Sequence, residues 1–321
     1  MIINQINQFA LNKIPFIVII NYDISKIKII PLELAAQEHI FYEINGKSNY
    51  DKKLDIKNDK KIKFEIFPVL YKQYLHSFNI VYQNLMRGNS YLTNLTFPTK
   101  VKTNYTLYEI FTSVSAPCKL FYKDEFVCFS PEPFVSIEDN IISSFPMKGT
   151  IDANIENAET IILNNFKEIA EHNTIVDLIR NDLNMVAENV YVKKFKYLSY
   201  IKTNRKNLIQ MSSQICGELE NSWESRLGNI LLSILPAGSV TGAPKKKTLE
   251  IIKLAEPYDR GWYTGIFGIF DGKNFYSYVM IRYIEKKGND YYFKSGGGIT
   301  VNSCPKNEYQ EMINKVYVPI Y

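Results

Sequence analysis

Short apolar runs broken by polar residues dominate the N-terminal part of the chain. Over residues 15–66, runs of Ile, Val, Phe and Tyr alternate with Asn, Gly and Lys, which is typical of strands and hairpins. The run Ile14–Ile20 is too short to cross a bilayer and is ended by Asn21 and Asp23, so we expect a buried strand there. The polar, lysine-rich segment Gly46–Lys63 predicts a mobile loop.

Helical periodicity begins near residue 69. Between residues 69 and 87 the apolar positions recur at helical spacing, which predicts an amphipathic helix that Gly88-Asn89 ends. Its apolar face would consist of Leu70, Tyr74, Phe78, Val81 and Leu85. Later helices are predicted at Asn157–Met185, Trp223–Leu235, Pro244–Leu254, and from Cys304-Pro305 to about Val316.

Further strands are predicted at Tyr91–Thr96, at two places within Lys119–Asp139, within Gly265–Ile284, and at Tyr291–Lys294. Long antiparallel strands with outer helices indicate an α+β fold with an antiparallel β-sandwich core. No repeat or low-complexity linker divides the chain, so we expect one domain over residues 1–321. In it, the strand region 1–66 would pack on a catalytic core of residues 67–321.

The composition is that of a folded protein, because hydrophobic residues make up 46% of the chain and charged residues 22%. The net charge is +5 and the lysines are scattered, which favours a solvated surface over a nucleic-acid site and suits a small dianionic substrate. None of the 4 cysteines forms a C-x-x-C pair, which argues against a zinc knuckle or a disulfide framework and fits a reducing cytoplasm. No signal-peptide pattern or membrane span is expected.

Several blocks carry the candidate chemistry. They are Ser130-Pro131-Glu132-Pro133, Pro146-Met147-Lys148-Gly149-Thr150, Glu171-His172 followed by Ile175–Asp182, Pro236–Lys245, Gly296-Gly297-Gly298-Ile299 and Glu308-Tyr309-Gln310-Glu311. Glu308 and Glu311 lie three apart on a predicted helix, so their carboxylates share one face and suit a hard cation such as Mg²⁺. The proline on each side of Glu132 stiffens its backbone.

Two features predict anion binding. The run Gly296–Gly298 would expose backbone N–H groups, and Thr241–Lys245 would aim the start of a helix at an anion. The spacing of Gly238, Gly242 and Lys245 is not that of a phosphate-binding P-loop, so we expect carboxylates rather than a nucleotide.

The order and spacing of these blocks resemble the chorismate-utilising enzymes, the family of the anthranilate, isochorismate and aminodeoxychorismate synthases. The resemblance extends from about Tyr91 to Lys315. In the block around position 148, anthranilate synthases have Ala where component I of aminodeoxychorismate synthase has Lys. Lys148 therefore indicates the aminodeoxychorismate branch.

The resemblance implies catalytic and metal-binding roles for matching residues. Lys148 corresponds to a nucleophile that attacks C2 of chorismate, and Glu132 to the acid that helps the C4 hydroxyl leave. Mg²⁺ would be held by Glu171 and Glu311, with help from Glu308, and would orient the ring carboxylate.

The resemblance also implies a set of substrate contacts. Tyr263, Arg282 and Lys315 would hold the enolpyruvyl carboxylate, since an arginine fork suits that group. The other expected contacts are Thr150, Gln210, Thr241, Gly242, Gly265, Gly296, Gly297 and Gly298.

The chain departs from the family pattern at two site positions. Isochorismate and salicylate synthases have a water-activating lysine where this chain has Leu92, and most amino-transferring relatives have Gln. Gln210 replaces a His found in many anthranilate and aminodeoxychorismate synthases, which argues mildly for a product that keeps its enolpyruvyl group. Relatives also have a longer N-terminal region with a tryptophan site in anthranilate synthases, so we expect no inhibition by tryptophan.

The reaction expected from the resemblance converts chorismate and ammonia to 4-amino-4-deoxychorismate, on the route to 4-aminobenzoate and folate. No cysteine lies in a nucleophile-elbow context, so the ammonia would come from a separate glutamine amidotransferase subunit or from free ammonium. Two alternatives stay open: component I of anthranilate synthase, which Lys148 argues against, and an inert chorismate-binding paralogue, which Leu92 and Gln210 favour.

Overall fold

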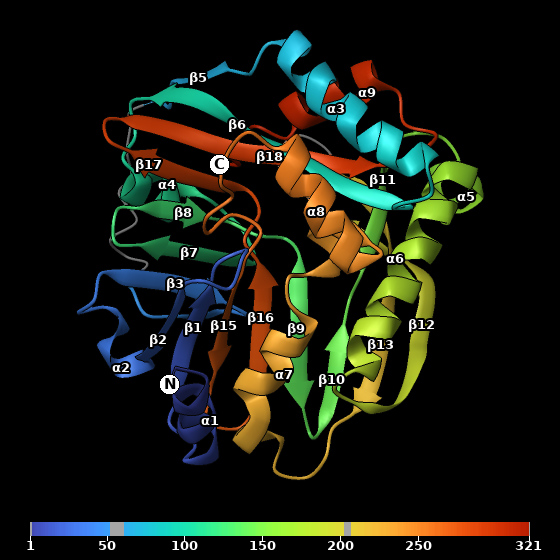
Figure 1. Ribbon diagram of the computed structural model, residues 1–321. Coiled ribbons are helices and arrows are strands. Elements are labelled where there is room, and N and C mark those ends of the chain that lie inside the picture. The colour runs from blue at the N-terminus through green and yellow to red at the C-terminus, as the bar shows by residue number, and fades with distance from the viewer. Residues whose placement is uncertain (1, 52–60, 202–206, 321) are drawn as a thin grey trace.

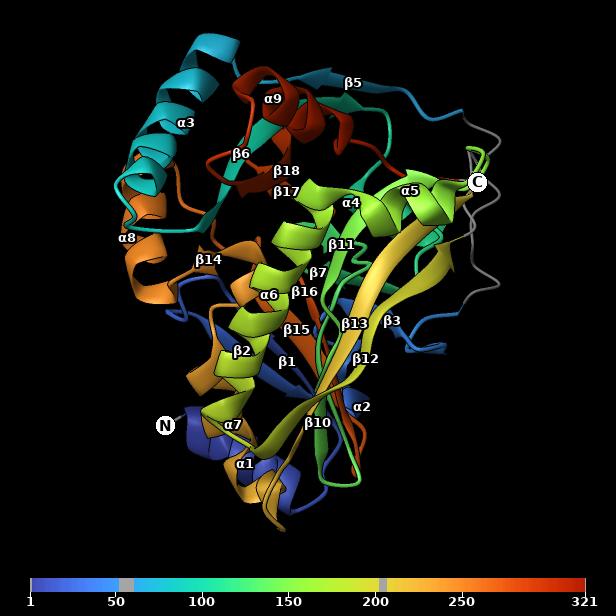
Figure 2. The same ribbon diagram turned by 90° about the vertical axis from the view of Figure 1, so that its right-hand side faces the viewer.

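Two antiparallel sheets pack against each other in the computed structural model, which describes residues 2–51, 61–201 and 207–320 (Figures 1 and 2). In Figure 1 the strands of one sheet run from side to side, and most strands of the other run from top to bottom. Helices cover the outer surfaces. The predicted α+β fold with an antiparallel sandwich core is therefore confirmed.

The first sheet contains the N-terminal strand near one edge. Within the described residues its order is β11 (Met147–Asp152), β13 (Leu208–Glu218), β10 (Ile141–Ser144), β9 (Pro133–Glu138), β16 (Phe275–Val279), β15 (Ile266–Phe270), β1 (Phe16–Ile20) and β2 (Ile27–Pro31), with β12 (Glu188–Ile201) also paired to β13. Because β1 pairs with β15, the two ends of the chain share this sheet.

The second sheet centres on one long antiparallel pair. Its order is β14 (Gly242–Ala243), β6 (Leu92–Thr103), β18 (Asp290–Ile299), β17 (Tyr283–Lys287), β8 (Phe126–Cys128), β7 (Cys118–Tyr122), β3 (Ile40–Ile44) and β4 (Lys47–Ser48), with β5 (Phe64–Phe67) also paired to β6. The β6–β18 ladder runs from Val101 opposite Tyr291 to Thr93 opposite Ile299, so it includes the whole glycine run.

Helices cover each sheet separately. The first sheet carries α1 (Ile2–Leu11), α5 (Ala158–Asn164), α6 (Phe166–Asn184) and α7 (Leu227–Ile234), together with the short α2 (Leu32–Ala35). The second carries α3 (Tyr71–Met86), α4 (Leu107–Ser113), α8 (Lys245–Ala255) and α9 (Pro305–Asn314). Two 3-10 turns, η2 (Trp223–Arg226) and η3 (Gly238–Val240), flank α7. None of the described helices is long and apolar enough to cross a membrane.

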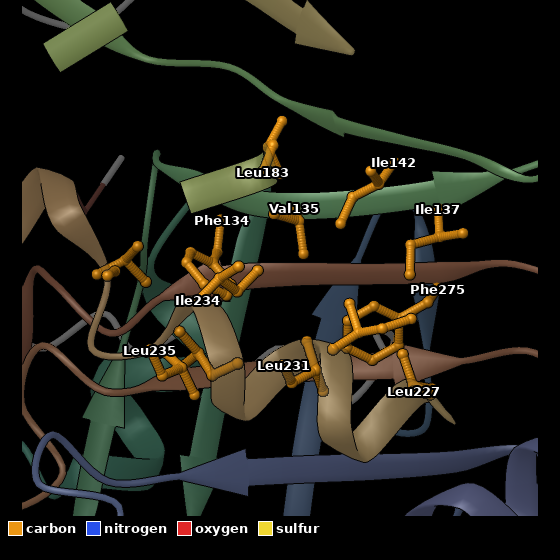
Figure 3. Packing of buried hydrophobic residues seen from close by; sticks show 14 of the residues in the cluster. Phe134, Val135, Ile137, Ile142, Leu183, Leu227, Leu231, Ile234, Leu235 and Phe275 are labelled. Carbon is orange, nitrogen blue, oxygen red and sulfur yellow. The ribbon is translucent and has the colours of Figure 1, made fainter. Parts of the chain in front are cut away.

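The strand β1 explains how one apolar run serves two cores. Its alternate residues Phe16, Val18 and Ile20 join the cluster under α1 and α7, and Ile17 and Ile19 join the cluster between the two sheets. All five residues are buried, so a strand covered on both faces has no polar alternation. Figure 3 shows the first of these clusters, in which residues of α7 pack on β9, β10 and β16.

Several predicted elements need correction. The run Asn157–Met185 is two helices, because the backbone of Asn165 is extended and its side chain accepts a hydrogen bond from the N–H of Glu168, which caps α6. Leu70 is not part of the buried face of α3, since it precedes the helix and is 70% exposed. The other four predicted positions on that face are buried.

Other elements were not predicted at all, namely α1, α4, the strands β10 to β13, and the short elements α2 and β14. The predicted mobile loop Gly46–Lys63 falls partly on residues 52–60, which lie outside the described residues. At its start, Lys47–Ser48 pairs with β3, and the side chain of Asn49 accepts a hydrogen bond from the backbone of Tyr42.

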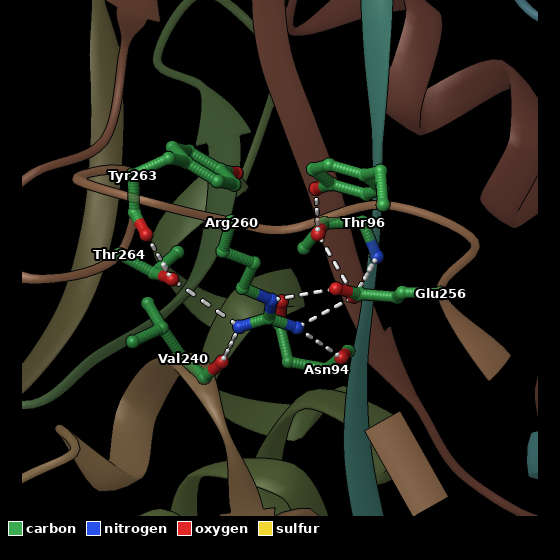
Figure 4. A network of polar contacts seen from close by, with 8 residues as sticks. Asn94, Thr96, Val240, Glu256, Arg260, Tyr263 and Thr264 are labelled. Atoms are coloured by element: carbon green, nitrogen blue, oxygen red, sulfur yellow. Dashed lines mark hydrogen bonds and ion pairs between the residues drawn. The ribbon is translucent and has the colours of Figure 1, made fainter. Parts of the chain in front are cut away.

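A buried ion pair fastens α8 to the second sheet (Figure 4). Arg260 is 2% exposed and Glu256 is 7% exposed, and their closest charged atoms are 2.7 Å apart. Arg260 also donates to the carbonyls of Val240 and Asn94, at 2.8 and 2.9 Å. Glu256 accepts from both the N–H and the hydroxyl of Thr96, so the charges on both partners are well solvated by protein groups.

We predict that Arg260→Ala lowers the free energy of unfolding by about 3–5 kcal/mol, because it leaves the Glu256 carboxylate buried without its counter-charge. Denaturant titration measures this change. The matched control is Arg226→Ala, which breaks an exposed pair with Glu220 and should cost less than about 1 kcal/mol. Losses of equal size would contradict a special role for the buried pair.

Candidate active site

A pocket of about 480 Å³ is lined by both sheets, by α6 and α9, and by the η3 turn. Its volume is in the range of small-molecule sites. Most of the predicted site residues line it: Glu132, Lys148, Glu171, Gln210, Tyr263, Arg282, Gly296, Gly297, Gly298, Glu308, Glu311 and Lys315. Blocks that lie far apart in the sequence are thus brought together, although their roles stay predictions.

Lys148 enters the pocket from a bulge in β11. The pairing with β13 shifts register between Lys148 and Thr150, and Gly149 adopts a left-handed φ of 74° at that point. The amine of Lys148 lies 3.8 Å from a carboxylate oxygen of Glu171, and the lysine side chain is 22% exposed. Thr150 pairs with Gln210 through the backbone. The bulge therefore directs a largely buried amine toward an acidic helix.

Glu132, the predicted acid, lies in the chain just before β9. Its N–H donates to the hydroxyl of Ser130, its carbonyl accepts from the N–H of Val279, and its carboxyl accepts from the hydroxyl of Ser239. Burial raises the pKa of Glu132, although the Ser239 hydrogen bond and the charges of nearby basic residues oppose the shift. The shift is in the direction that a general acid requires, because a raised pKa lets the carboxyl keep its proton to a higher pH.

Two glutamate pairs line the pocket. On α9, Glu308 and Glu311 lie three residues apart, and on α6 Glu168 and Glu171 have the same spacing. A Cβ atom at Gly297 would lie 3.5 Å from an oxygen of Glu311 and 3.7 Å from one of Glu308. Glu168 was not predicted, although the same helical spacing argument could have found it.

The donor chemistry of these glutamates fits Mg²⁺, which prefers carboxylate oxygens and retains several waters. Among the described residues, no three His, Cys, Asp or Glu side chains lie close enough together to hold a metal ion by themselves. Water molecules would have to supply the remaining ligands. Ser303 donates to Glu308 at 2.8 Å, and Lys315 pairs with Glu311 at 2.7 Å, so both carboxylates are already oriented. The residues present therefore fit an ion that keeps water and gains a substrate oxygen.

Basic residues lie beside the glutamates. Lys315 donates to the carbonyl of Gly296 at 2.9 Å, and burial lowers its pKa. Arg282 has a left-handed φ of 51°, an uncommon conformation for a residue with a side chain, and its guanidinium carbon is 5.5 Å from the ring centre of Tyr317. The ring of Tyr263 is buried, and burial raises the pKa of its hydroxyl, which stays protonated and can donate to a carboxylate.

The glycine run is part of a paired strand, whereas we expected it to expose backbone N–H groups for an anion. Gly296–Gly298 pair with residues 94–96 of β6. A Cβ at Gly298 would lie 2.8 Å from a methyl carbon of Leu92 and 3.5 Å from the amine of Lys148. Gly298 therefore leaves room chiefly for the side chain of Leu92, while Gly296 allows a close approach to the backbone of β6 and Gly297 faces the glutamates and Lys315.

Three predicted contacts lie behind the pocket wall rather than on it. The hydroxyl of Thr241 donates to the carbonyl of Ala237, and a Cβ at Gly242 would lie 1.9 Å from the carbonyl oxygen of Leu92. A Cβ at Gly265 would lie 2.1 Å from the carbonyl oxygen of Ile20. These residues allow close backbone packing. Lys245, at the start of α8, pairs with Asp182 at 2.8 Å, so the predicted anion cradle at this helix start is not part of the pocket.

The family model described as "chorismate binding enzyme" matches residues 33–320. The chain belongs to the chorismate-binding enzyme family. This match includes every block from which the resemblance was inferred, and the chain is a chorismate-utilising enzyme by family.

Similar proteins differ in what they are named. An uncharacterized PabA-like protein of Haemophilus influenzae is 48% identical over 99% of this chain and 96% of its own length. The aminodeoxychorismate synthase component 1 of Bacillus subtilis is 31% identical over 66% of this chain and 47% of its own length. The anthranilate synthase component 1 of Pseudomonas aeruginosa is 34% identical over 58% of this chain and 38% of its own length.

Solved structures in the family share the fold. The menaquinone-specific isochorismate synthase MenF of Escherichia coli superposes with a TM-score of 0.72, covering 98% of this chain and 79% of that one at 15% identity. The anthranilate synthase component I of Streptococcus pneumoniae gives a TM-score of 0.67 at 24% identity, covering 79% of this chain and 58% of that one. At these identities the likeness concerns the fold alone.

We predict that Glu132→Gln raises the free energy of unfolding at pH 8. At that pH the wild type must either keep the buried Glu132 ionised or keep it protonated above the usual pKa of a carboxyl group, and both cost stability. A group with a raised pKa contributes stability that is present below its unfolded value of 4.5 and is lost as the pH rises through its folded value. The gain from Glu132→Gln should therefore vanish near pH 4. Thermal unfolding of both proteins across this range measures it, and a gain that grew toward acid pH would contradict the assignment.

Proposed function

We propose that this chain is the chorismate-aminating component I of an aminodeoxychorismate synthase. The observation that carries the proposal is the side chain of Lys148, which lies in the pocket 3.8 Å from Glu171. Relatives named aminodeoxychorismate synthase and anthranilate synthase match at similar identity, so overall identity does not separate them. In the family pattern, the residue at position 148 distinguishes the two enzymes, since aminodeoxychorismate synthases have Lys there and anthranilate synthases have Ala.

The proposed reaction divides the work between two side chains. The Lys148 amine, in its neutral form, attacks C2 of the chorismate ring while Glu132 gives its proton to the C4 hydroxyl, which leaves as water. Ammonia then forms a bond to C4 as the bond between C2 and the Lys148 nitrogen breaks. The electron pair of that bond returns to Lys148 as its neutral amine, and the new amino group at C4 keeps its extra proton, as an ammonium. The enolpyruvyl group is kept, and the product is 4-amino-4-deoxychorismate.

The charged side chains that line the pocket are proposed to bind the substrate. Arg282, Lys315 and the hydroxyl of Tyr263 would hold the enolpyruvyl carboxylate, since they line one part of the pocket. The glutamates of α6 and α9 would hold Mg²⁺, with Glu171 and Glu311 as its main ligands and Glu168 and Glu308 assisting. When bound, the ion would neutralise and orient the ring carboxylate.

Ammonia is proposed to come from a glutamine amidotransferase subunit. The four cysteines offer no glutaminase nucleophile, since Cys118, Cys128 and Cys216 are buried and Cys304 is exposed at the start of α9, away from any histidine partner in the described hydrogen bonds. A partner or free ammonium must therefore supply the nitrogen. The product would serve 4-aminobenzoate and folate synthesis.

A product assay tests the proposal. Purified protein is mixed with chorismate, Mg²⁺ and an ammonium salt, and the products are analysed by mass spectrometry and fluorescence. We expect a species in which an amine replaces the hydroxyl and the enolpyruvyl group is intact. Fluorescent anthranilate with released pyruvate would instead identify an anthranilate synthase. Chorismate binding without turnover, even with a glutaminase subunit and glutamine, would identify an inert paralogue.

Lys148→Ala provides the matched mechanistic test. Loss of a covalent nucleophile should reduce formation of 4-amino-4-deoxychorismate by at least about 100-fold while chorismate still binds. Lys253→Ala on α8 is the control, because this residue is exposed and does not line the pocket, so its loss should have no effect. Near-normal turnover of Lys148→Ala would refute the nucleophilic role.

We predict that Glu311→Ala raises the Mg²⁺ concentration needed for half-maximal activity by about 10-fold or more, because a carboxylate oxygen is lost from the ion's site. A Mg²⁺ titration at saturating chorismate measures the shift. Glu250→Ala, in an exposed pair with Lys247, is the control. An unchanged titration would mean that the ion binds elsewhere.

A further inference from the structure

A second, much smaller cavity lies behind Glu132. Its volume is about 20 Å³, and Glu132 and Ser239 line both this cavity and the main pocket. Apolar side chains such as Phe134, Ile179 and Leu183 form most of its wall. Besides Glu132, the ionisable residue on its wall is Asp182, near the C-terminal end of α6.

Asp182 forms an ion pair with Lys245. Its carboxylate lies 2.8 Å from the amine of Lys245, and the two side chains are only 12% and 18% exposed. The same amine donates to the carbonyl of Ile234 at 2.8 Å. At Gly238, a Cβ would lie 2.8 Å from Leu178 and 3.2 Å from Asp182, so the absence of a side chain there lets α6 approach the turn that carries Ser239.

The cavity has the size and the partners that one water needs. A water molecule requires about 10–15 Å³ of such space and two to four polar partners. Glu132, Asp182 and Ser239, whose side chains carry such polar groups, are among the residues that line it. Ser144 also lines the cavity, but its hydroxyl already donates to the carbonyl of Phe134, and most of the remaining wall is apolar.

We propose that Asp182, Lys245 and one water in this cavity form a proton relay that reprotonates Glu132 from behind. The proposal rests on the proposed function, in which Glu132 loses a proton in each turnover. With chorismate in the main pocket, the front of Glu132 faces substrate rather than solvent. The cavity then offers a path for a proton that does not pass the substrate.

The transfer is balanced. Glu132 gives its proton to the departing hydroxyl, which leaves as water. The cavity water then donates a proton to the Glu132 carboxylate and receives one from Asp182, which takes it from the Lys245 ammonium. Lys245, at the partly exposed end, regains a proton from solvent. Burial raises the pKa of both Asp182 and Glu132, so each carboxyl can hold a proton during the transfer.

Asp182→Asn tests the relay, because asparagine keeps the shape and the hydrogen bonds but cannot carry a proton. We expect kcat with ammonium to fall about 10-fold while KM for chorismate changes less than about two-fold. Raising the concentration of a small buffer acid, imidazolium, should restore part of kcat, and the solvent isotope effect on kcat should increase. A purely structural role would produce neither change.

Two further variants sharpen the test. Ala237→Val adds methyl groups at the cavity wall and should displace the water, with the same loss and the same rescue, although every ionisable group is intact. Asp177→Asn changes an exposed carboxylate of the same helix, 71% exposed, and should leave kcat unaltered. Thermal unfolding checks that each variant is folded.

The outcomes separate the relay from the proposed function. Wild-type kcat for Asp182→Asn, or a loss that buffer does not rescue, overturns the relay. A raised KM for ammonium in place of a lowered kcat also overturns it, since the cavity would then carry the nitrogen donor. Anthranilate as the wild-type product overturns the proposed function only, because the same hydroxyl must still leave and the same comparison applies.

An infrared measurement tests the bridge without turnover. The band of the protonated Glu132 carboxyl is identified as the difference between wild type and Glu132→Gln. Asp182→Asn and Ala237→Val should both shift this band, since the cavity water no longer donates to it. An unshifted band in both variants overturns the relay even if no product forms.

Discussion

The buried guanidinium of Arg260 holds together the segments that form one wall of the pocket. It binds Glu256, which caps the C-terminal end of α8, the carbonyl of Val240 in the η3 turn, and the carbonyl of Asn94 on β6. Asn94 and Val240 both line the pocket, and Val240 follows Ser239, which donates to Glu132. The orientation of the acid therefore depends on a charge that the pocket does not expose. A partner lost from this network would leave a buried charge unpaired, so independent movement of these segments carries a large energetic cost.

The second organising feature is the mixture of charges in one pocket. Glutamates from α6 and α9 face Lys148, Lys315 and Arg282, and the ion pairs at 3.8 and 2.7 Å hold two of these lysines in place. A dianionic substrate can thus meet cations without leaving the glutamates uncompensated. Glu132 differs because one side of it contacts the apolar cavity, and burial outweighs the nearby cations in setting its pKa. Different surroundings let carboxyl groups in one pocket perform different tasks.

Much of the fold could be predicted from local patterns, and the failures have physical causes. The apolar run of β1 and the buried face of α3 depend on periodicity, which the sequence contains. The strand character of Gly296–Gly298 depends on β6, about two hundred residues away, and glycine has a low strand propensity of its own. The break at Asn165 depends on one side-chain hydrogen bond. The ladder of β12 contains several register shifts, so its side chains do not alternate regularly. In the site, Glu168 was within reach of the spacing argument, whereas the positions of Thr241, Gly242 and Gly265 behind the wall required the backbone.

The surroundings of Lys148 connect these points to the chemistry. A Cβ at Gly298 would lie 2.8 Å from a methyl carbon of Leu92 and 3.5 Å from the amine, so Leu92 and Lys148 both lie close to this glycine. Leucine has no group that could hold or activate a water molecule. The nearest charged partner of the amine is Glu171, at 3.8 Å, on the helix whose glutamates line the opposite wall. The amine therefore lies between an apolar side chain of β6 and the acidic residues of α6. At position 92, where this chain departs from the family pattern, the side chain packs against Gly298 beside the amine of Lys148.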